Sequence, residues 1–334
     1  MRAFTVERYG DEAGLRAGEV PDPEVGAHDV LIRIQAASVN PLDRMIRDGE
    51  LKAILPYRLP VVLGNDLAGI VVEVGAAVTR FAVGDEVFAR PDKDRIGTFA
   101  ELIAVHQDDV AIKPATLTME EAASLPLVAL TSWQALVERA NIQPGQRVLV
   151  HAGSGGLGTI AIQLAKHLGA HVATTTSTAN VDLVKRLGAD VVVDYKKQAF
   201  ETVLHDYDVV LDSLGGETLL KSLGVLKPGG QVISVSGPPD AAFGRELGAN
   251  PVIRLVMSAL SSRIRRRARR RNVTYSFLFM KASGDQLREL TPLIEAGRIR
   301  PVVDTVFSFE SAPEALEYLE TGRAKAGKVV LKMT

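Results

Sequence analysis

Short runs of branched aliphatic residues alternate with glycine and proline breaks through roughly the first 120 residues of the chain. The segments 30–35 and 68–74 are rich in valine and isoleucine, and Gly75, Gly84 and Gly97 interrupt the chain after them. Branched aliphatic residues favour strands, and closely spaced glycines favour the turns between strands. This pattern predicts an irregular β-barrel.

From residue 147 the hydrophobic pattern changes to a regular alternation of strands and helices, with helices expected over 156–168 and 181–187. Strands that alternate with helices are joined by right-handed crossovers and form a parallel, doubly wound sheet. The strands expected in this sheet are 148–150, 171–175, 191–193, 209–211, 231–235 and 273–280.

The last part of the chain returns to a strand–helix–strand pattern over 301–332. We therefore expect an α/β chain in which a nucleotide-binding domain is inserted into a barrel-like domain. The expected division is a first part of the barrel-like domain over 1–125, the nucleotide-binding domain over 126–280, and a return to the first domain over 281–334.

A glycine cluster at 153–158 fits the pattern G-x-G-x-x-G. Glycines between a strand and a helix can serve only as turn formers, but this cluster follows an apolar strand and begins an apolar-faced helix, which is the context of a dinucleotide site. The first glycine permits the tight turn, the second lets the backbone approach a pyrophosphate, and the third lets helix and strand pack closely. The residues expected at the cofactor phosphates are Gly153, Ser154, Gly155, Gly156, Leu157 and Gly158.

The end of the next strand carries no acidic residue, and the first acid beyond it is Asp182. NAD sites place an Asp or Glu here to bind the ribose 2′-hydroxyl, and a carboxylate would repel a 2′-phosphate. Ser177, Asn180 and Tyr195 are candidates to bind such a phosphate, so NADP(H) is the expected cofactor. Alternatively, Ser177 and Asn180 only cap the following helix.

The 334-residue chain has a net charge of −1, no cysteine, no apolar leader at its N-terminus and no membrane-spanning apolar run. Nothing in this overall balance favours nucleic acid or a membrane as a partner, and without cysteine there are no disulfides or thiolate metal sites. We expect a cytoplasmic protein.

Four motifs together resemble the medium-chain dehydrogenase/reductase superfamily: 38–43 (SVNPLD), 64–75 (GNDLAGIVVEVG), 81–88 (FAVGDEVF) and 122–126 (AASLP). Within it the chain is similar to the zinc-independent quinone oxidoreductases, and most of all to their alkenal/enone reductase branch. The resemblance implies a GroES-like β-barrel domain with a Rossmann domain. It also implies transfer of a hydride from NADPH to a quinone or an α,β-unsaturated carbonyl compound, with no zinc.

The zinc-dependent members of this superfamily have a cysteine ligand near the position of Asn40 and a Gly-His-Glu where this chain has Gly64, Asn65 and Asp66. A catalytic zinc needs three protein ligands, and six scattered histidines do not rebuild that set. A zinc alcohol dehydrogenase is therefore the less favoured alternative.

The resemblance assigns Asn40 and Asp43 to the active-site loop, where Asn40 could donate to the substrate carbonyl or the nicotinamide ribose; alternatively both side chains only close a turn. Asn65 replaces a zinc ligand and is expected to line the pocket. Tyr57 is a candidate proton donor in place of the tyrosine that several relatives have at Met45, or a simple loop aromatic. The further cofactor contacts that the resemblance implies are Thr131, Ser236, Gly237, Phe277, Phe279 and Lys328. Alternatively, Lys328 is only a solvated lysine at the end of a strand.

Seven arginines lie within residues 263–271. They suggest an alternative function, a cofactor-bound binding protein that uses the run on RNA or acidic partners, although a solvated helix face is the simpler interpretation. Nucleic acid is not the expected partner.

The strand expected over 273–280 has apolar residues at Val273, Tyr275, Phe277 and Phe279. An apolar edge of a sheet needs a cover, and in the resembling family the matching edge pairs across a two-fold axis. We expect a homodimer through this strand.

Overall fold

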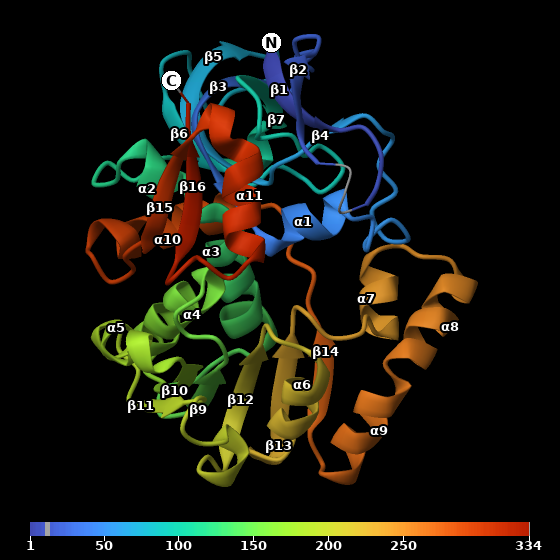
Figure 1. Cartoon of the computed structure of the whole chain (residues 1–334), viewed down its shortest axis with the longest axis vertical. Coiled ribbons are helices and arrows are strands. Elements are labelled where there is room, and N and C mark those ends of the chain that lie inside the picture. Colours follow the sequence, from blue (N-terminus) through green and yellow to red (C-terminus); the bar gives the residue numbers. More distant parts are fainter. Residues whose placement is uncertain (11–13, 334) are drawn as a thin grey trace. The chain divides into compact units, whose positions relative to one another are not determined.

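The computed structural model describes residues 1–10 and 14–333, which form two units (Figure 1). The first unit combines residues 1–130 with residues 281–334, and the second is the continuous segment 131–280. The first boundary lies within α3 (Pro126–Trp133), five residues after the division expected from the sequence, which falls at the start of this helix.

The first unit is built around a seven-stranded sheet of order β15-β16-β3-β5-β6-β8, in which β7 also pairs with β3. A smaller sheet has the order β2-β1-β4. The strands of the large sheet are β3 (Asp29–Val39), β5 (Asp66–Val74), β6 (Glu86–Ala89), β7 (Leu102–His106), β8 (Val110–Ile112), β15 (Val303–Ser308) and β16 (Lys328–Lys332); those of the small sheet are β1 (Arg2–Val6), β2 (Arg16–Glu19) and β4 (Val61–Val62).

Strand β3 is the centre of this unit because its apolar residues, apart from the half-buried Leu31, are buried. It pairs antiparallel with β5 on one side and with β16 on the other, so that Ser38 lies opposite Asp66 and Val330. The C-terminal segment therefore completes the sheet that the N-terminal segment begins. The helices of the unit are α1 (Pro41–Arg47), α2 (Met119–Ala123), α10 (Gly284–Glu295) and α11 (Ala312–Glu320), with short 3₁₀ turns at Gln107–Asp109 and Phe309–Ser311.

The second unit contains a six-stranded sheet of order β11-β10-β9-β12-β13-β14 in which every pair is parallel. Buried apolar runs such as Val148 to Val150 are typical of parallel strands that are covered on both faces. The expected doubly wound Rossmann sheet, with a GroES-like domain, is thus confirmed. The strands are β9 (Arg147–Val150), β10 (His171–Thr176), β11 (Val191–Asp194), β12 (Tyr207–Asp212), β13 (Leu226–Ser234) and β14 (Thr274–Phe277).

The strand order reverses between β9 and β12, so the carboxyl ends of these strands mark the switch point where ligands bind in such sheets. The helices of this unit that follow α3 are a π-helical segment (Gln134–Arg139), α4 (Gly156–His167), α5 (Val181–Arg186), α6 (Gly216–Ser222), α7 (Ala241–Glu246), α8 (Pro251–Leu260) and α9 (Ser262–Arg270), with 3₁₀ turns at Thr178–Asn180 and Phe200–Thr202. No helix in the described ranges is both long and apolar enough to cross a bilayer.

Strand β14 lies at the edge of the sheet, but it ends at Phe277, three residues before the expected end. Its apolar side chains do not form an uncovered edge, because Val273, Tyr275 and Phe277 are buried within the chain. Phe243 packs edge to face on Phe277, with 5.0 Å between the ring centroids. The argument for a dimer from an uncovered apolar edge is therefore wrong, and the dimer stays a prediction that rests on the position of β14 at the sheet edge and on the family resemblance.

Candidate active site

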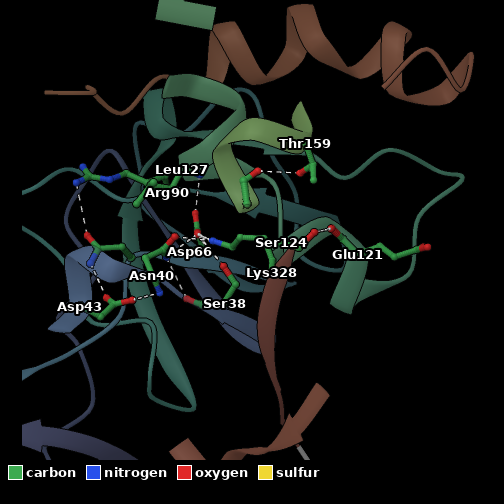
Figure 2. A network of polar contacts seen from close by, with 12 residues as sticks. Ser38, Asn40, Asp43, Asp66, Arg90, Glu121, Ser124, Leu127, Thr159 and Lys328 are labelled. Atoms are coloured by element: carbon green, nitrogen blue, oxygen red, sulfur yellow. Dashed lines mark hydrogen bonds and ion pairs between the residues drawn. The ribbon is translucent and has the colours of Figure 1, made fainter. Parts of the chain in front are cut away.

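A buried polar cluster lies in the first unit where β16, β3 and β5 run side by side (Figure 2). The pairing of these strands brings Ser38 of β3, Asp66 of β5 and Lys328 of β16 together, although they are far apart in the sequence. Asn40 follows β3 directly and is the residue before α1. All four residues are almost completely shielded from solvent.

Asp66 is the centre of the cluster, and its carboxylate accepts four hydrogen bonds. Its Oδ2 accepts from Ser38 Oγ at 2.7 Å, Asn40 Nδ2 at 2.9 Å and Lys328 Nζ at 3.1 Å. Its Oδ1 accepts from the backbone N–H of Leu127 at 2.7 Å. A buried carboxylate needs a cation and several donors to offset the loss of water, and this set supplies both.

Lys328 is therefore not the solvated strand-end lysine of the alternative interpretation. Its side chain is only 6% exposed, and its ammonium also donates to Oδ1 of Asn40. The two hydrogens of the Asn40 amide are both used, toward Asp66 and toward the carbonyl of Ser38 at 3.2 Å. Asn40 thus holds Asp66 and Lys328 in place and has no amide hydrogen left for a substrate.

Asp43 continues the cluster from the first turn of α1. Its Oδ2 accepts from the backbone N–H of Asn40 and its Oδ1 from Nδ2 of Asn65, both at 2.7 Å. Burial raises the pKa of Asp43 to about 7, helped by the nearby Asp66 carboxylate and opposed by the two hydrogen bonds and by Lys328. Asp43 does close the turn, as the alternative interpretation held, and the raised pKa also makes this carboxyl a candidate functional group.

Arg90 is the most deeply buried cation among the described residues of this unit, and the sequence analysis did not identify it. It is 1% exposed and donates to the carbonyl of Pro91 at 2.7 Å and to Oδ1 of Asn65 at 3.5 Å. Its Nε has no hydrogen-bond partner among the described residues. Burial lowers the pKa of this guanidinium from its ordinary value.

The hydroxyl of Tyr57 donates to the backbone carbonyl of Lys93 and not to a residue of the buried cluster. Burial raises the pKa of this phenol, with Arg90 acting in the opposite direction and Asp43 in the same direction. A phenol whose pKa is raised, and whose proton is already donated to a backbone carbonyl, is a weak proton donor. Tyr57 is therefore less suited to the proton-donor role that the sequence suggested.

The expected cofactor turn lies in the second unit, at the carboxyl end of β9, where Gly155 is the residue before α4. A Cβ on Gly153 would lie 2.0 Å from Oγ1 of Thr174, and one on Gly158 would lie 2.3 Å from the carbonyl oxygen of Ala152. A Cβ on Gly155 would meet only that same carbonyl oxygen, at 3.3 Å. The first and third glycines thus allow close packing, the second leaves an open approach, and the free N–H groups at a helix N-terminus bind phosphate. These residues fit a dinucleotide pyrophosphate.

The residues expected at the 2′-phosphate gather around Ser154. Its Oγ accepts from Thr176 Oγ1 at 3.0 Å and from Asn180 Nδ2 at 3.1 Å, and that amide also reaches Ser177 Oγ at 3.5 Å. Neither Ser177 nor Asn180 makes a side-chain capping bond to the helix after it in the described structure, contrary to the alternative interpretation.

Tyr195 lies next to this group, because its N–H donates to the carbonyl of Thr176 at 3.1 Å and its side chain is exposed. The exposed Lys196 and Lys197 follow it, and Lys197 pairs with Asp194 at 3.5 Å. The sequence interpretation found no basic residue at the strand end. The signal was present just after the next strand, β11, which the sheet places beside β10.

The remaining predicted cofactor residues lie elsewhere in the second unit. Ser236 and Gly237 follow β13, and Ser236 Oγ donates to the carbonyl of Ser213 at 3.0 Å. Phe277 is a core residue at the end of β14, whereas Phe279 is half-buried and lies 6.0 Å from Phe243 between ring centroids. Thr131 is buried in α3.

Metal ligands do not gather in either unit. Across residues 1–10 and 14–333, no group of three or more His, Asp or Glu side chains could hold a metal ion. His151 is buried, which lowers its pKa to about 4, and its ring nitrogens lie 2.8 Å from Ser222 Oγ and 3.1 Å from Thr175 Oγ1. It is a structural histidine of the second sheet.

Two family models match the chain: "Alcohol dehydrogenase GroES-like domain" over residues 26–115 and "Zinc-binding dehydrogenase" over residues 187–331. The chain is 37% identical to a 2-methylene-furan-3-one reductase of Solanum lycopersicum and 36% identical to a chloroplastic NADPH-dependent alkenal/one oxidoreductase of Arabidopsis thaliana; each match covers 99% of this chain and 79% of the relative. Among solved structures, a quinone oxidoreductase from Coxiella burnetii is 31% identical with a TM-score of 0.87, over 100% of this chain and 99% of that one.

The glycine turn offers a matched pair of substitutions. Gly158→Ala should destabilise the protein by ~1–3 kcal/mol, because the new methyl group meets backbone atoms that cannot yield. Gly155→Ala should change stability by less than ~1 kcal/mol but weaken NADPH binding, because it fills the approach of the pyrophosphate. Thermal unfolding and NADPH fluorescence titration measure the two effects. An unchanged NADPH affinity in Gly155→Ala would contradict this assignment of the turn.

Two lysines of β16 test the buried cluster. Lys328→Met should lower the free energy of unfolding by ~3–5 kcal/mol, because it leaves the Asp66 carboxylate buried without its cation. Lys332→Met removes an ion pair with Glu120 from a side chain that is 61% exposed, and should cost less than ~1 kcal/mol. Urea denaturation compares the variants, and equal losses would show that the Lys328–Asp66 pair has no special importance.

Proposed function

Since the chain belongs to the medium-chain dehydrogenase/reductase superfamily, we propose that it is an NADPH-dependent, zinc-independent reductase of quinones or α,β-unsaturated carbonyl compounds. The observation that carries the proposal is the buried cluster in which Lys328 bonds to Asn40 and Asp66, two residues at or near the positions that the resemblance assigns to the metal site of zinc-dependent members. The relatives named alkenal/one oxidoreductase and 2-methylene-furan-3-one reductase support an enone substrate, and the Coxiella structure supports a quinone.

The donor set supports chemistry without zinc. Asn40 and Asn65 offer neutral amides where a divalent cation would favour thiolate or imidazole, and the chain has no cysteine. The Lys328 ammonium lies 3.1 Å from Asp66 Oδ2 and would repel a metal ion bound to that carboxylate.

NADPH, when bound, supplies the hydride, and negative charge then develops on the carbonyl oxygen of the substrate. The protein stabilises that charge with donors placed in advance. Lys328 donates to Asn40 and Asp66, and an ammonium has a third N–H. We assign this third N–H to the nicotinamide ribose or the carbonyl oxygen, with Asn40 as the residue that positions it.

Proton supply is assigned to the chain of hydrogen bonds around Asp43. This carboxyl has a pKa of about 7 and bonds to Asn65, which in turn contacts Arg90. A group with such a pKa exchanges protons readily near neutral pH. Tyr57, with its raised pKa, is the less suitable donor.

In the second unit, we assign the pyrophosphate to Gly155, Gly156 and the start of α4, and the 2′-phosphate to Ser177, Asn180 and Tyr195. Lys196 and Lys197 add positive charge next to them. The contacts with the nicotinamide half of the cofactor stay predictions, and they are Thr131, Ser236, Gly237 and Phe279. The homodimer through β14 and a cytoplasmic location also stay predictions.

Steady-state assays test the reaction. NADPH should be oxidised only when a small enone or a 1,4-quinone is present, and a zinc chelator should leave the rate unchanged. Asn40→Ala should lower kcat by ~10- to 100-fold through misplacement of Lys328. Lys332→Met is the matched control and should keep full activity. No oxidation with any acceptor at saturating NADPH would refute the proposal.

The choice of cofactor is tested with the two lysines after β11. Lys196→Ala combined with Lys197→Ala should weaken NADPH binding by about tenfold and leave NADH binding nearly unchanged, because only NADPH carries the 2′-phosphate. Lys185→Ala combined with Arg186→Ala removes two exposed cations from α5 in the same unit and serves as the control. Fluorescence titration with both cofactors gives the affinities, and equal losses for NADH and NADPH would contradict the assignment.

A further inference from the structure

Helix α8 presents an apolar stripe to solvent. The stripe consists of four side chains that are between 52% and 71% exposed: Val252, Leu255, Val256 and Leu260. Leu255 and Val256 follow Val252 by three and four positions, and Leu260 follows Val256 by four, so all of them share one face of the helix. The opposite face carries the buried Met257, which packs against Gly244 of α7. The helix thus packs on the protein through the face that carries Met257, and its apolar stripe faces solvent.

Helix α9 follows at once and carries the arginine run. Its inner residues Ile264 and Ala268 are buried, and the helix packs beside β14 (Figure 1). Six arginines are exposed, and none of the described residues forms an ion pair with them. These are Arg263, Arg266, Arg267, Arg269, Arg270 and Arg271.

The seventh arginine joins the two helices. Arg265 donates to the carbonyl of Ser258 at 2.7 Å and to its Oγ at 2.6 Å, and to Oγ of Ser261 at 3.1 Å. Ser261 ends α8 and precedes α9. The apolar stripe and the cationic helix are therefore held together as one surface, which we call the α8–α9 surface.

An occupant of the α8–α9 surface must offer both an apolar phase and negative charge. A second copy of the chain paired along α8 would bring two arginine clusters together, which like-charge repulsion disfavours. A nucleic acid would satisfy the arginines but not the aliphatic stripe, because single-strand binding relies on aromatic stacking. The headgroup region of an anionic bilayer satisfies both requirements.

We propose that the α8–α9 surface binds anionic phospholipid membranes, with the α8 stripe inserted at the headgroup boundary and the α9 arginines on the lipid phosphates. The net charge of −1 led to the expectation of no membrane partner, but that value averages over the chain and conceals a local cluster of seven cations. The inference does not depend on the proposed reaction.

Flotation of the full chain with vesicles tests the proposal. The protein should bind vesicles of phosphatidylcholine with 30 mol% phosphatidylglycerol (roughly the charge of an anionic leaflet), bind pure phosphatidylcholine weakly, and dissociate as salt rises. Arg266→Glu with Arg267→Glu should reduce binding at least about tenfold. Val252→Ser with Leu255→Ser should do the same, because it removes inserted apolar area.

The matched control is Lys185→Glu with Arg186→Glu, which makes the same charge change at exposed positions of α5 and should alter binding less than about twofold. Circular dichroism checks that each variant is folded. Three results would overturn the proposal: vesicle binding that the α8 and α9 variants do not reduce, arginine-dependent binding of a single-stranded RNA without vesicle binding, or conversion of a dimer to a monomer by Val252→Ser with Leu255→Ser in sedimentation velocity.

Discussion

The ion pair between the Asp66 carboxylate and the Lys328 ammonium is the contact around which the first unit is organised. Two charges removed from water stabilise a fold only when they meet each other and when further donors complete their coordination. Ser38, Asn40 and the N–H of Leu127 supply those donors. Because Lys328 comes from the C-terminal strand, this requirement joins the last residues of the chain to the sheet that the first residues build.

The same burial determines the properties of the surrounding groups. A continuous series of hydrogen bonds leads from Lys328 through Asn40 to Asp43, and then through Asn65 to Arg90. In such a water-poor setting each group strongly affects the next. Burial raises the pKa of Asp43 to about 7 and lowers that of Arg90. The cluster that holds the strands together is thus also suited to stabilise charge and move protons.

Charge is distributed differently in the second unit. At the carboxyl ends of β10 and β11, small hydroxyl and amide groups gather around Ser154, and two lysines follow Tyr195. On α9 the arginines are concentrated on one helix beside an outward apolar stripe on α8. The nearly neutral total charge of the chain therefore conceals two local concentrations of positive charge, one after β11 and one on α9.

The sequence alone determined the features that depend on neighbours a few residues away. The glycine turn at 153–158 and the helix after it were predicted because their spacing is local, and Asn40 and Asp43 are only three positions apart in their turn. Only the tertiary structure decided that Lys328 belongs to the buried cluster, since its partners Asn40 and Asp66 lie 288 and 262 residues away. It also placed Arg90 beside Asn65, turned Val273 and Phe277 into the core, and turned the α8 stripe outward. A periodic pattern shows which residues share a face, but which face meets solvent depends on what packs against it, and that contact is made by distant parts of the chain.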